Sequence, residues 1–143
     1  MQIEIIPLEG CEDLVPNYAH LSDGAVDLRC SEGFSLDFLE RKAVPCGFKI
    51  ALPDGWAGLV LPRSGISLKR GITVVNTPGL IDSGYRGEIK VPLISFSKER
   101  QEFSRGDRIA QFLAIRAEKM EFARALSLPS SDRGEGGFGS TGV

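Results

Sequence analysis

The sequence has few of the residues that most metal sites and nucleophile sites use. It contains one histidine and three cysteines among 143 residues, and Cys11, Cys30 and Cys46 form no C-x-x-C pair. This spacing argues against a zinc knuckle or a thioredoxin-type redox site, so we expect free buried thiols. The single histidine, His20, precedes a turn cluster, and no G-x-S-x-G window accompanies it, which argues against a serine hydrolase. A G-x-x-x-x-G-K-[ST] pattern is also missing, which argues against a P-loop nucleotide hydrolase.

The chain also lacks an excess of basic residues and a long apolar run. Its 17 Lys and Arg stand against 19 Asp and Glu, for a net charge of -2. A protein that binds the nucleic-acid backbone usually presents a basic face instead. No apolar run approaches the ~18 residues of a membrane span, and residues 1–4 lack the features of a secretory signal. We therefore expect no nucleic-acid partner, no membrane partner and a cytoplasmic location.

Alternation of apolar and polar residues is the dominant pattern, and it predicts short β-strands. The longest series consists of Val44, Cys46, Phe48, Ile50 and Leu52. The 17 glycines and 8 prolines suit frequent turns between such strands, which is typical of an all-β sandwich or barrel. Neither a repeat nor a linker divides residues 1–132, so we expect one domain there. Residues 114–126 differ, because they are rich in helix formers and local propensity favours a helix.

The C-terminal residues 133–143 have a different composition from the rest of the chain. Glycines alternate there with Arg133, Phe138, Ser140 and Thr141. Such a segment cannot bury enough apolar surface to fold alone, so we expect a flexible arm. A guanidinium, backbone N–H groups and two hydroxyls can nevertheless bind phosphate, and an aromatic ring can stack on a base.

Three further segments carry groups that suit a polyphosphate nucleotide. Residues 62–67 contain Arg63, Ser64 and Gly65, which supply a guanidinium, a hydroxyl and a close approach to backbone. Residues 76–90 begin with Asn76, whose amide can both donate to and accept from a pyrimidine edge, and their apolar flanks and Pro-Gly pair predict a hairpin. Residues 106–111 read as a turn that leads into a strand. Each segment alone is also compatible with an ordinary surface turn.

Residues 24–28, 62–67, 76–90, 106–111 and 133–142 resemble, in that order, the five sequence motifs of the trimeric dUTPases. The resemblance implies an all-β, jelly-roll-like subunit in a homotrimer whose active sites are shared between subunits. It implies a C-terminal arm, residues 133–143, that closes over an active site. It also implies hydrolysis of dUTP to dUMP and pyrophosphate with Mg²⁺, by attack of water on the α-phosphorus. Such a reaction limits uracil incorporation into DNA and supplies dUMP for thymidylate synthesis.

The same resemblance implies a role for each site residue. Asp82 would deprotonate the attacking water, Asp27 would hold Mg²⁺ through its water shell, and Tyr85 would pack against the deoxyribose. The substrate contacts would be Arg63, Ser64, Gly65 and Gln111 for phosphate; Asn76, Leu80 and Ile81 for uracil; Lys90; and Arg133, Phe138, Gly139, Ser140 and Thr141 of the arm. Phosphoryl transfer needs mainly positioning and charge neutralisation, so the shortage of histidine and cysteine is no obstacle.

The chain departs from the family pattern at two places. Gly24-Ala25 stands where the first motif usually reads Ala-Gly, and the family places strand where residues 114–126 favour helix. We expect strand for at least part of that segment. Two other functions stay open. A dCTP deaminase-like enzyme of the same fold is disfavoured by Arg63-Ser64-Gly65 and Asp82. A non-catalytic, nucleotide-binding regulatory module is disfavoured because both Asp27 and Asp82 are retained.

Overall fold

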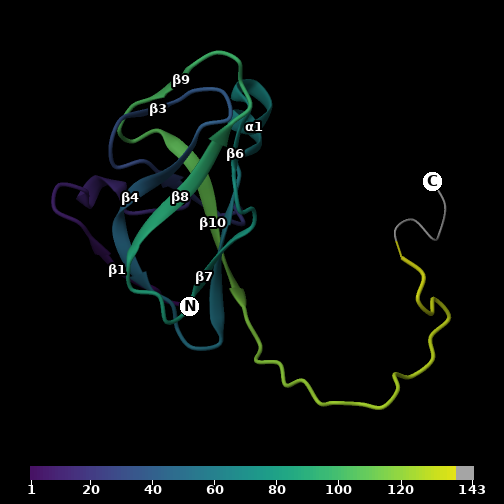
Figure 1. Ribbon diagram of the computed structural model, residues 1–143. Helices are drawn as coiled ribbons and strands as arrows, with labels where there is room; N and C mark the ends of the chain where they lie inside the picture. Colours follow the sequence, from purple (N-terminus) through teal and green to yellow (C-terminus); the bar gives the residue numbers. More distant parts are fainter. Residues whose placement is uncertain (138–143) are drawn as a thin grey trace.

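Short β-strands are the main regular structure of the protein, as the alternating sequence predicts (Figure 1). The computed structural model describes residues 1–137. Its strands are β1 (Glu4–Pro7), β2 (Val26–Arg29), β3 (Phe34–Leu36), β4 (Arg41–Ala51), β5 (Trp56–Leu61), β6 (Ile72–Val74), β7 (Gly79–Asp82), β8 (Glu88–Ser95), β9 (Gln101–Phe103) and β10 (Arg108–Arg116). A 3-10 turn, η1 (Glu12–Leu14), and one α-helix, α1 (Ser64–Arg70), complete the regular structure. Over the described residues, no helix is long and apolar enough to cross a membrane.

The strands form two four-stranded antiparallel sheets that enclose one core. Their strand orders are β1-β4-β8-β6 and β2-β10-β5-β7, and β3 pairs with β9 in a small third sheet. The predicted series on β4 is confirmed, because Val44, Cys46, Phe48 and Ile50 are all buried. They pack with residues of the second sheet such as Leu28, Val60, Ile109 and Phe112. This arrangement of two layers is the predicted all-β, jelly-roll-like subunit.

The hairpin predicted over residues 76–90 is wrong. Strand β6 pairs with β8 in the first sheet, whereas β7 pairs with β5 in the second sheet. The turn at residues 75–78 therefore carries the chain from one sheet to the other. The turn residues are compatible both with a hairpin and with a crossing between sheets. Which of the two forms depends on β5 and β8, the strands with which β7 and β6 pair.

The helix propensity of residues 114–126 is not realised, and the expectation of strand for part of the segment is confirmed. Residues 114–116 end β10, where each of them pairs with a residue of β5. The remaining residues run away from the body without regular structure. An isolated helix of this length is marginal in water, because most helical stability in proteins comes from packing against another surface.

All three cysteines are free and buried, as expected. Burial raises the pKa of the Cys46 thiol to about 12, and the nearby Cys30 and Glu88 add to the shift. Burial also raises the pKa of Cys30 above its ordinary value. These thiols fill the core as small apolar side chains.

Candidate functional site

A polar pocket of about 300 Å³ lies where β2, the start of α1 and β10 meet. It is lined by Ala19, Asp23, Gly24, Ala25, Asp27, Arg63, Ser64, Gly65 and Gln111. Sheet pairing explains why these residues meet: Gln111 lies opposite Asp27 on one side and opposite Leu61, just before Arg63, on the other. Gln111 Nε2 also donates to the carbonyl of Pro62 at 3.0 Å. Three of the five segments selected in the sequence therefore come together in one chain.

The carboxylate of Asp27 is held between two guanidinium groups. Arg63 Nε lies 2.7 Å from Asp27 Oδ1, and Arg108 Nη1 lies 3.3 Å from Asp27 Oδ2. About a quarter of each side chain is exposed for Asp27 and Arg63, so water only partly screens this pair. Two guanidinium groups beside one carboxylate leave a net positive charge, which suits a phosphate ligand.

Helix α1 forms where the sequence indicated only a turn. It ends at Gly71, whose φ of 64° lies in the left-handed region and whose N–H is bonded to the carbonyls of Ile66 and Ser67. Ile66 packs against the core, which gives this short helix its tertiary support. Ser64 and Gly65, its first residues, line the polar pocket.

Asp82 lies away from this pocket in the same chain. It pairs with Ala57 at the start of β5, whereas Gln111 pairs with Leu61 at the end of β5. Four residues of strand correspond to about 13 Å, and Figure 1 shows α1 and β7 toward opposite ends of the body. No residue of the segment 76–90, all of which the structure describes, lines the polar pocket.

The segment around Asp82 forms an exposed surface of its own. Leu80 and Tyr85 are large side chains with more than a third of their surface in water, and Asp82 is exposed beside them. The Tyr85 hydroxyl donates to the carbonyl of Glu88 at 2.9 Å. The Tyr85 ring lies so close to Gly87 that a Cβ at that position would overlap it. The Tyr85 ring is thus held in one orientation on an exposed surface that also carries Asp82.

The remaining predicted residues lie in four places. Ile81 is on β7 and packs partly against the core. Asn76 is exposed in the turn before β7, with its amide against Gly79. Lys90 is on β8, where its Nζ lies 3.8 Å from Glu88 Oε2. Arg133 lies on the C-terminal segment, where its Nε donates to the carbonyl of Gly136 at 2.7 Å. The predicted arm residues Phe138, Gly139, Ser140 and Thr141 lie outside the described residues.

Sequence reasoning missed Arg108 and Asp23 as residues of the pocket region. Asp23 precedes the reversed Gly24-Ala25 pair, and its Oδ2 accepts a bond from the His20 backbone N–H at 2.8 Å. Arg108 belongs to the selected segment 106–111, but a spacing of three places it and Gln111 on opposite faces of a regular strand. The selection of segment 106–111 could have drawn attention to Arg108. Strict alternation, however, predicts that its side chain faces away from Gln111.

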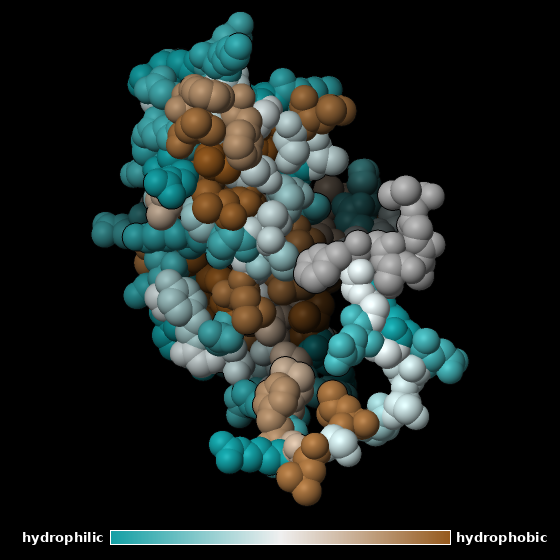
Figure 2. Space-filling view, turned by 45° about the vertical axis from the view of Figure 1, so that its right-hand side comes forward, coloured by the Kyte–Doolittle hydropathy of each residue, from teal (hydrophilic) through white to brown (hydrophobic). Residues whose placement is uncertain are grey.

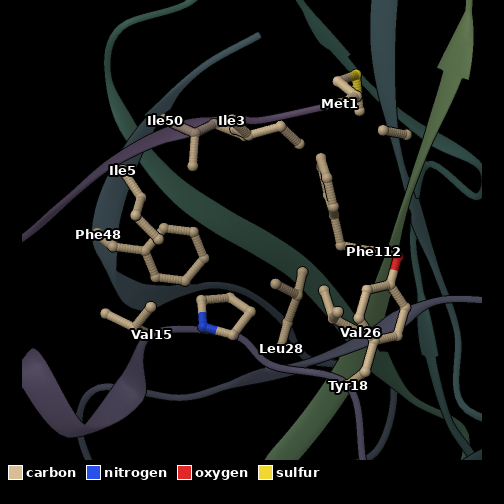
Figure 3. Close-up of a pocket in the computed structure, with 12 residues that line it drawn as sticks. Met1, Ile3, Ile5, Val15, Tyr18, Val26, Leu28, Phe48, Ile50 and Phe112 are labelled. Atoms are coloured by element: carbon tan, nitrogen blue, oxygen red, sulfur yellow. The ribbon is translucent and has the colours of Figure 1, made fainter. Parts of the chain in front are cut away.

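A second hollow, of about 250 Å³, is apolar and lies between β1, β2, β4 and β10 (Figure 3). Aliphatic and aromatic side chains from both sheets surround it, among them Ile3, Ile5, Val26, Phe48 and Phe112. It contains no guanidinium or carboxylate in its lining. Such a lining suits apolar side chains and not a triphosphate.

Comparison with known proteins gives a consistent result. The family model described as dUTPase matches residues 13–142. The deoxyuridine 5'-triphosphate nucleotidohydrolase of Bifidobacterium longum (strain NCC 2705) is 52% identical over 128 residues, which cover 89% of this chain and 81% of that protein. That of Fusobacterium nucleatum is 42% identical over 144 residues, 99% of this chain and 97% of the relative. The solved Staphylococcus bacteriophage 80alpha dUTPase with dUPNHPP superposes with a TM-score of 0.87 at 25% identity, over 99% of both chains. The chain belongs to the dUTPase family.

Proposed function

We propose that this chain hydrolyses dUTP to dUMP and pyrophosphate at a site that a second copy of the chain completes. One observation carries this proposal: Asp27, Arg63 and Gln111 share a polar pocket, while the carboxylate of Asp82 is exposed elsewhere on the same chain. The substrate is inferred from the names of the relatives, which are deoxyuridine 5'-triphosphate nucleotidohydrolases. The polar pocket contains groups that can bind its phosphates. Removal of dUTP limits uracil incorporation into DNA, and the product dUMP supplies thymidylate synthesis.

The polyphosphate binds in the polar pocket. Arg63 and Gln111 donate hydrogen bonds, and the Ser64 hydroxyl and Gly65 backbone add further donors at the start of α1. No group of three or more His, Cys, Asp and Glu in residues 1–137 could hold a metal directly. Mg²⁺ typically keeps several waters and binds through one or two carboxylates plus substrate phosphates, so Asp27 fits a Mg²⁺ that arrives with the nucleotide. When bound, Mg²⁺ supplies neutralisation of the phosphate charge.

Asp82 supplies the base. Its carboxylate accepts a proton from a water molecule, and the resulting hydroxide attacks the α-phosphorus. The bond from the α-phosphorus to the bridging oxygen breaks, and pyrophosphate leaves with the electron pair. Asp82 is exposed in the single chain. This fits the role, because the phosphates and the attacking water would lie at the polar pocket of a second copy of the chain.

The residues around Asp82 select the nucleoside. The Asn76 amide and the backbone of Leu80 and Ile81 bind the uracil edge. The Tyr85 ring, fixed by Glu88 and Gly87, packs against C2′ of the deoxyribose and leaves no room for a hydroxyl. Lys90 contributes a further substrate contact from β8.

A homotrimer with shared sites accounts for two features of the single chain. Asp82 and the polar pocket are too far apart for one nucleotide α-phosphate to reach both. Residues 117–131 also carry Met120, Phe122, Leu126 and Leu128, each largely exposed. Figure 2 shows apolar residues on this segment clear of the body. Exposed apolar side chains of this number favour association with another copy.

The arm, residues 133–143, then closes over the site of a neighbouring subunit. Arg133 brings a guanidinium to the phosphates, Phe138 stacks on uracil, and Gly139, Ser140 and Thr141 contribute donors. The arm begins after residue 132, and residues 117–131, which run away from the body, connect it to β10. Free buried thiols at Cys30 and Cys46 fit a reducing compartment and thus the proposed cytoplasmic location.

The test is steady release of pyrophosphate from dUTP at catalytic enzyme concentration, with Mg²⁺ present. Ammonium release from dCTP would instead identify a dCTP deaminase-like enzyme. Tight binding of the analogue dUPNHPP with no turnover of dUTP would identify a nucleotide-binding regulatory module. Each outcome is distinct, so one series of three assays separates the three functions.

A further inference from the structure

Strand β10 contains a bulge beside the polar pocket. Its pairing with β2 shifts register between Arg108 and Ala110. Ile109 and Ala110 are neighbours in sequence, yet both are completely buried. In a regular strand successive side chains point to opposite faces, so the extra residue returns Arg108 to the same outward face as Gln111. The bulge thereby adds an arginine to the site that strict alternation would have turned away.

Arg108 contacts both members of the ion pair in the pocket. Its Nη1 lies 3.3 Å from Asp27 Oδ2, and its carbonyl accepts a bond from Arg63 Nη1 at 3.2 Å. Arg63 therefore has its Nε on Asp27 and its Nη1 on Arg108, which leaves Nη2 as the remaining corner of the guanidinium. These two contacts orient the Arg63 guanidinium toward Asp27, and a phosphate that takes Arg63 Nε must displace the Asp27 carboxylate from it.

We propose that Arg108 is a positioning residue of the phosphate site, which holds Asp27 in place when Arg63 turns to the nucleotide. The proposal rests on the proposed function, because it assigns Arg63 to phosphate. A half-buried carboxylate that loses its partner is costly, and Arg108 remains as the second partner of Asp27. Without Arg108, Asp27 and Arg63 would form a neutral pair, and phosphate would compete with Asp27 for the one guanidinium that lines the pocket.

The first experiment compares Arg108→Gln with the matched control Arg29→Gln. Arg29 lies opposite Arg108 in the β2–β10 pair and bonds the carbonyl of Gly106, not Asp27. Both variants lose one positive charge near the pocket. We expect Arg108→Gln to bind dUPNHPP on the order of 10- to 100-fold more weakly than the control, by calorimetry. The two variants should melt at similar temperatures. A dissociation constant within twofold of the control overturns the proposal.

A second experiment tests whether Arg108 acts through Asp27. In a double-mutant cycle with Asp27→Asn, Arg108→Gln should have little further effect on dUPNHPP binding. Additive losses would overturn the proposal.

Arg108→Lys keeps a cation within reach of Asp27 and should restore most of the binding, whereas a loss equal to that of Arg108→Gln would contradict the proposal. If Arg108→Gln does not fold, Arg108→Met, which keeps the aliphatic part of the side chain, is used in its place. If neither variant folds, Arg108 has a structural role and the proposal is overturned.

These results also separate this proposal from the proposed function. If the wild-type protein neither hydrolyses dUTP nor binds dUPNHPP, the proposed function itself fails. If the wild type does both and Arg108→Gln behaves like Arg29→Gln, only the role of Arg108 fails.

Discussion

Asp82 and Gln111 pair with the same strand, β5, from its two sides and near its two ends. Asp82 lies opposite Ala57, and Gln111 lies opposite Leu61. Because Gln111 lines the polar pocket with Asp27 and Arg63, we expect a site that uses both Asp82 and this pocket to draw on two chains. Subunit exchange can test this geometry directly.

We predict that chains with Arg63→Gln and with Asp82→Asn complement each other. Each variant alone should be nearly inactive, because every site lacks either the guanidinium or the base. After co-refolding, some mixed oligomers contain a site with native Arg63 from one chain and native Asp82 from another, and dUTP hydrolysis returns. The measurement is pyrophosphate release after mixing, with mixed oligomers verified by native mass spectrometry. Mixed oligomers with no recovered activity would show that both residues act within one chain.

Replacement of the base should impair chemistry and spare binding. Asp82→Asn keeps the side-chain shape but cannot accept a proton from water at neutral pH, so kcat should fall by about 10²–10⁴-fold. Binding of dUPNHPP should stay close to wild type. The control is Asp54→Asn, because Asp54 is an exposed aspartate outside the polar pocket and outside residues 76–90. This variant should keep normal kcat. A near-normal kcat for Asp82→Asn would remove Asp82 from the chemical step.

The orientation of Tyr85 should determine the choice of sugar. Gly87→Ala places a methyl group where the Tyr85 ring lies, so the ring must move. Both Gly87→Ala and Tyr85→Ala should reduce the preference for dUTP over UTP, by about 5- to 100-fold in kcat/KM. Gly84→Ala is the matched control, because a Cβ there meets nothing within 4 Å. If the preference is unchanged in Tyr85→Ala, another group excludes the 2′-hydroxyl.

The strands could largely be predicted from the sequence, since they depend on local patterns. The resemblance to the dUTPase motifs, and not a local pattern, indicates the segments that line the polar pocket. The buried alternation on β4 follows directly from Val44 to Ile50. Helix α1 could not be predicted, because seven residues are too few for a periodic signal. It depends on Gly71 as a left-handed cap and on packing of Ile66, and both are properties of the folded chain.

Pairing across long distances in the sequence explains the other differences. The assignment of β6 and β7 to different sheets depends on β8 and β5, which a local turn pattern does not contain. The same holds for Arg108, since the bulge at Ile109 and Ala110 appears only when β10 is aligned with β2. Alternation of apolar and polar residues predicts which face of a sheet a side chain occupies only where the strands pair in regular register. The polar pocket lies beside the register shift between β10 and β2.

The buried thiol of Cys46 should make the protein less stable at alkaline pH. Its pKa is about 12 in the folded protein against an ordinary value of 9.0, because burial disfavours the thiolate. The raised pKa means that the thiol contributes full stability below pH 9.0 and loses that contribution as the pH rises toward 12. Cys46→Val should therefore lose less thermal stability than wild type between pH 8 and 10.5. Equal losses in both proteins would contradict the shift.

Removal of the arm should leave a folded protein with little turnover. A chain truncated after Asp132 keeps both sheets and the core, so its melting temperature should match that of a control lacking only Val143. Turnover should fall on the order of 10²-fold or more, because Arg133 and Phe138 no longer align the phosphates and the base. Full activity of the truncated chain would exclude the arm from the site.

Whether the arm acts on another subunit can be tested with the same truncated chain and an Asp82→Asn chain whose arm is intact. Each should be nearly inactive alone. If the arm reaches a site that uses Asp82 of a different chain, some mixed oligomers hold a native Asp82 from the truncated chain and an arm from the other. Those sites have every group that phosphoryl transfer needs, and pyrophosphate release returns. If verified mixed oligomers stay inactive, the arm closes only on sites that use Asp82 of its own chain.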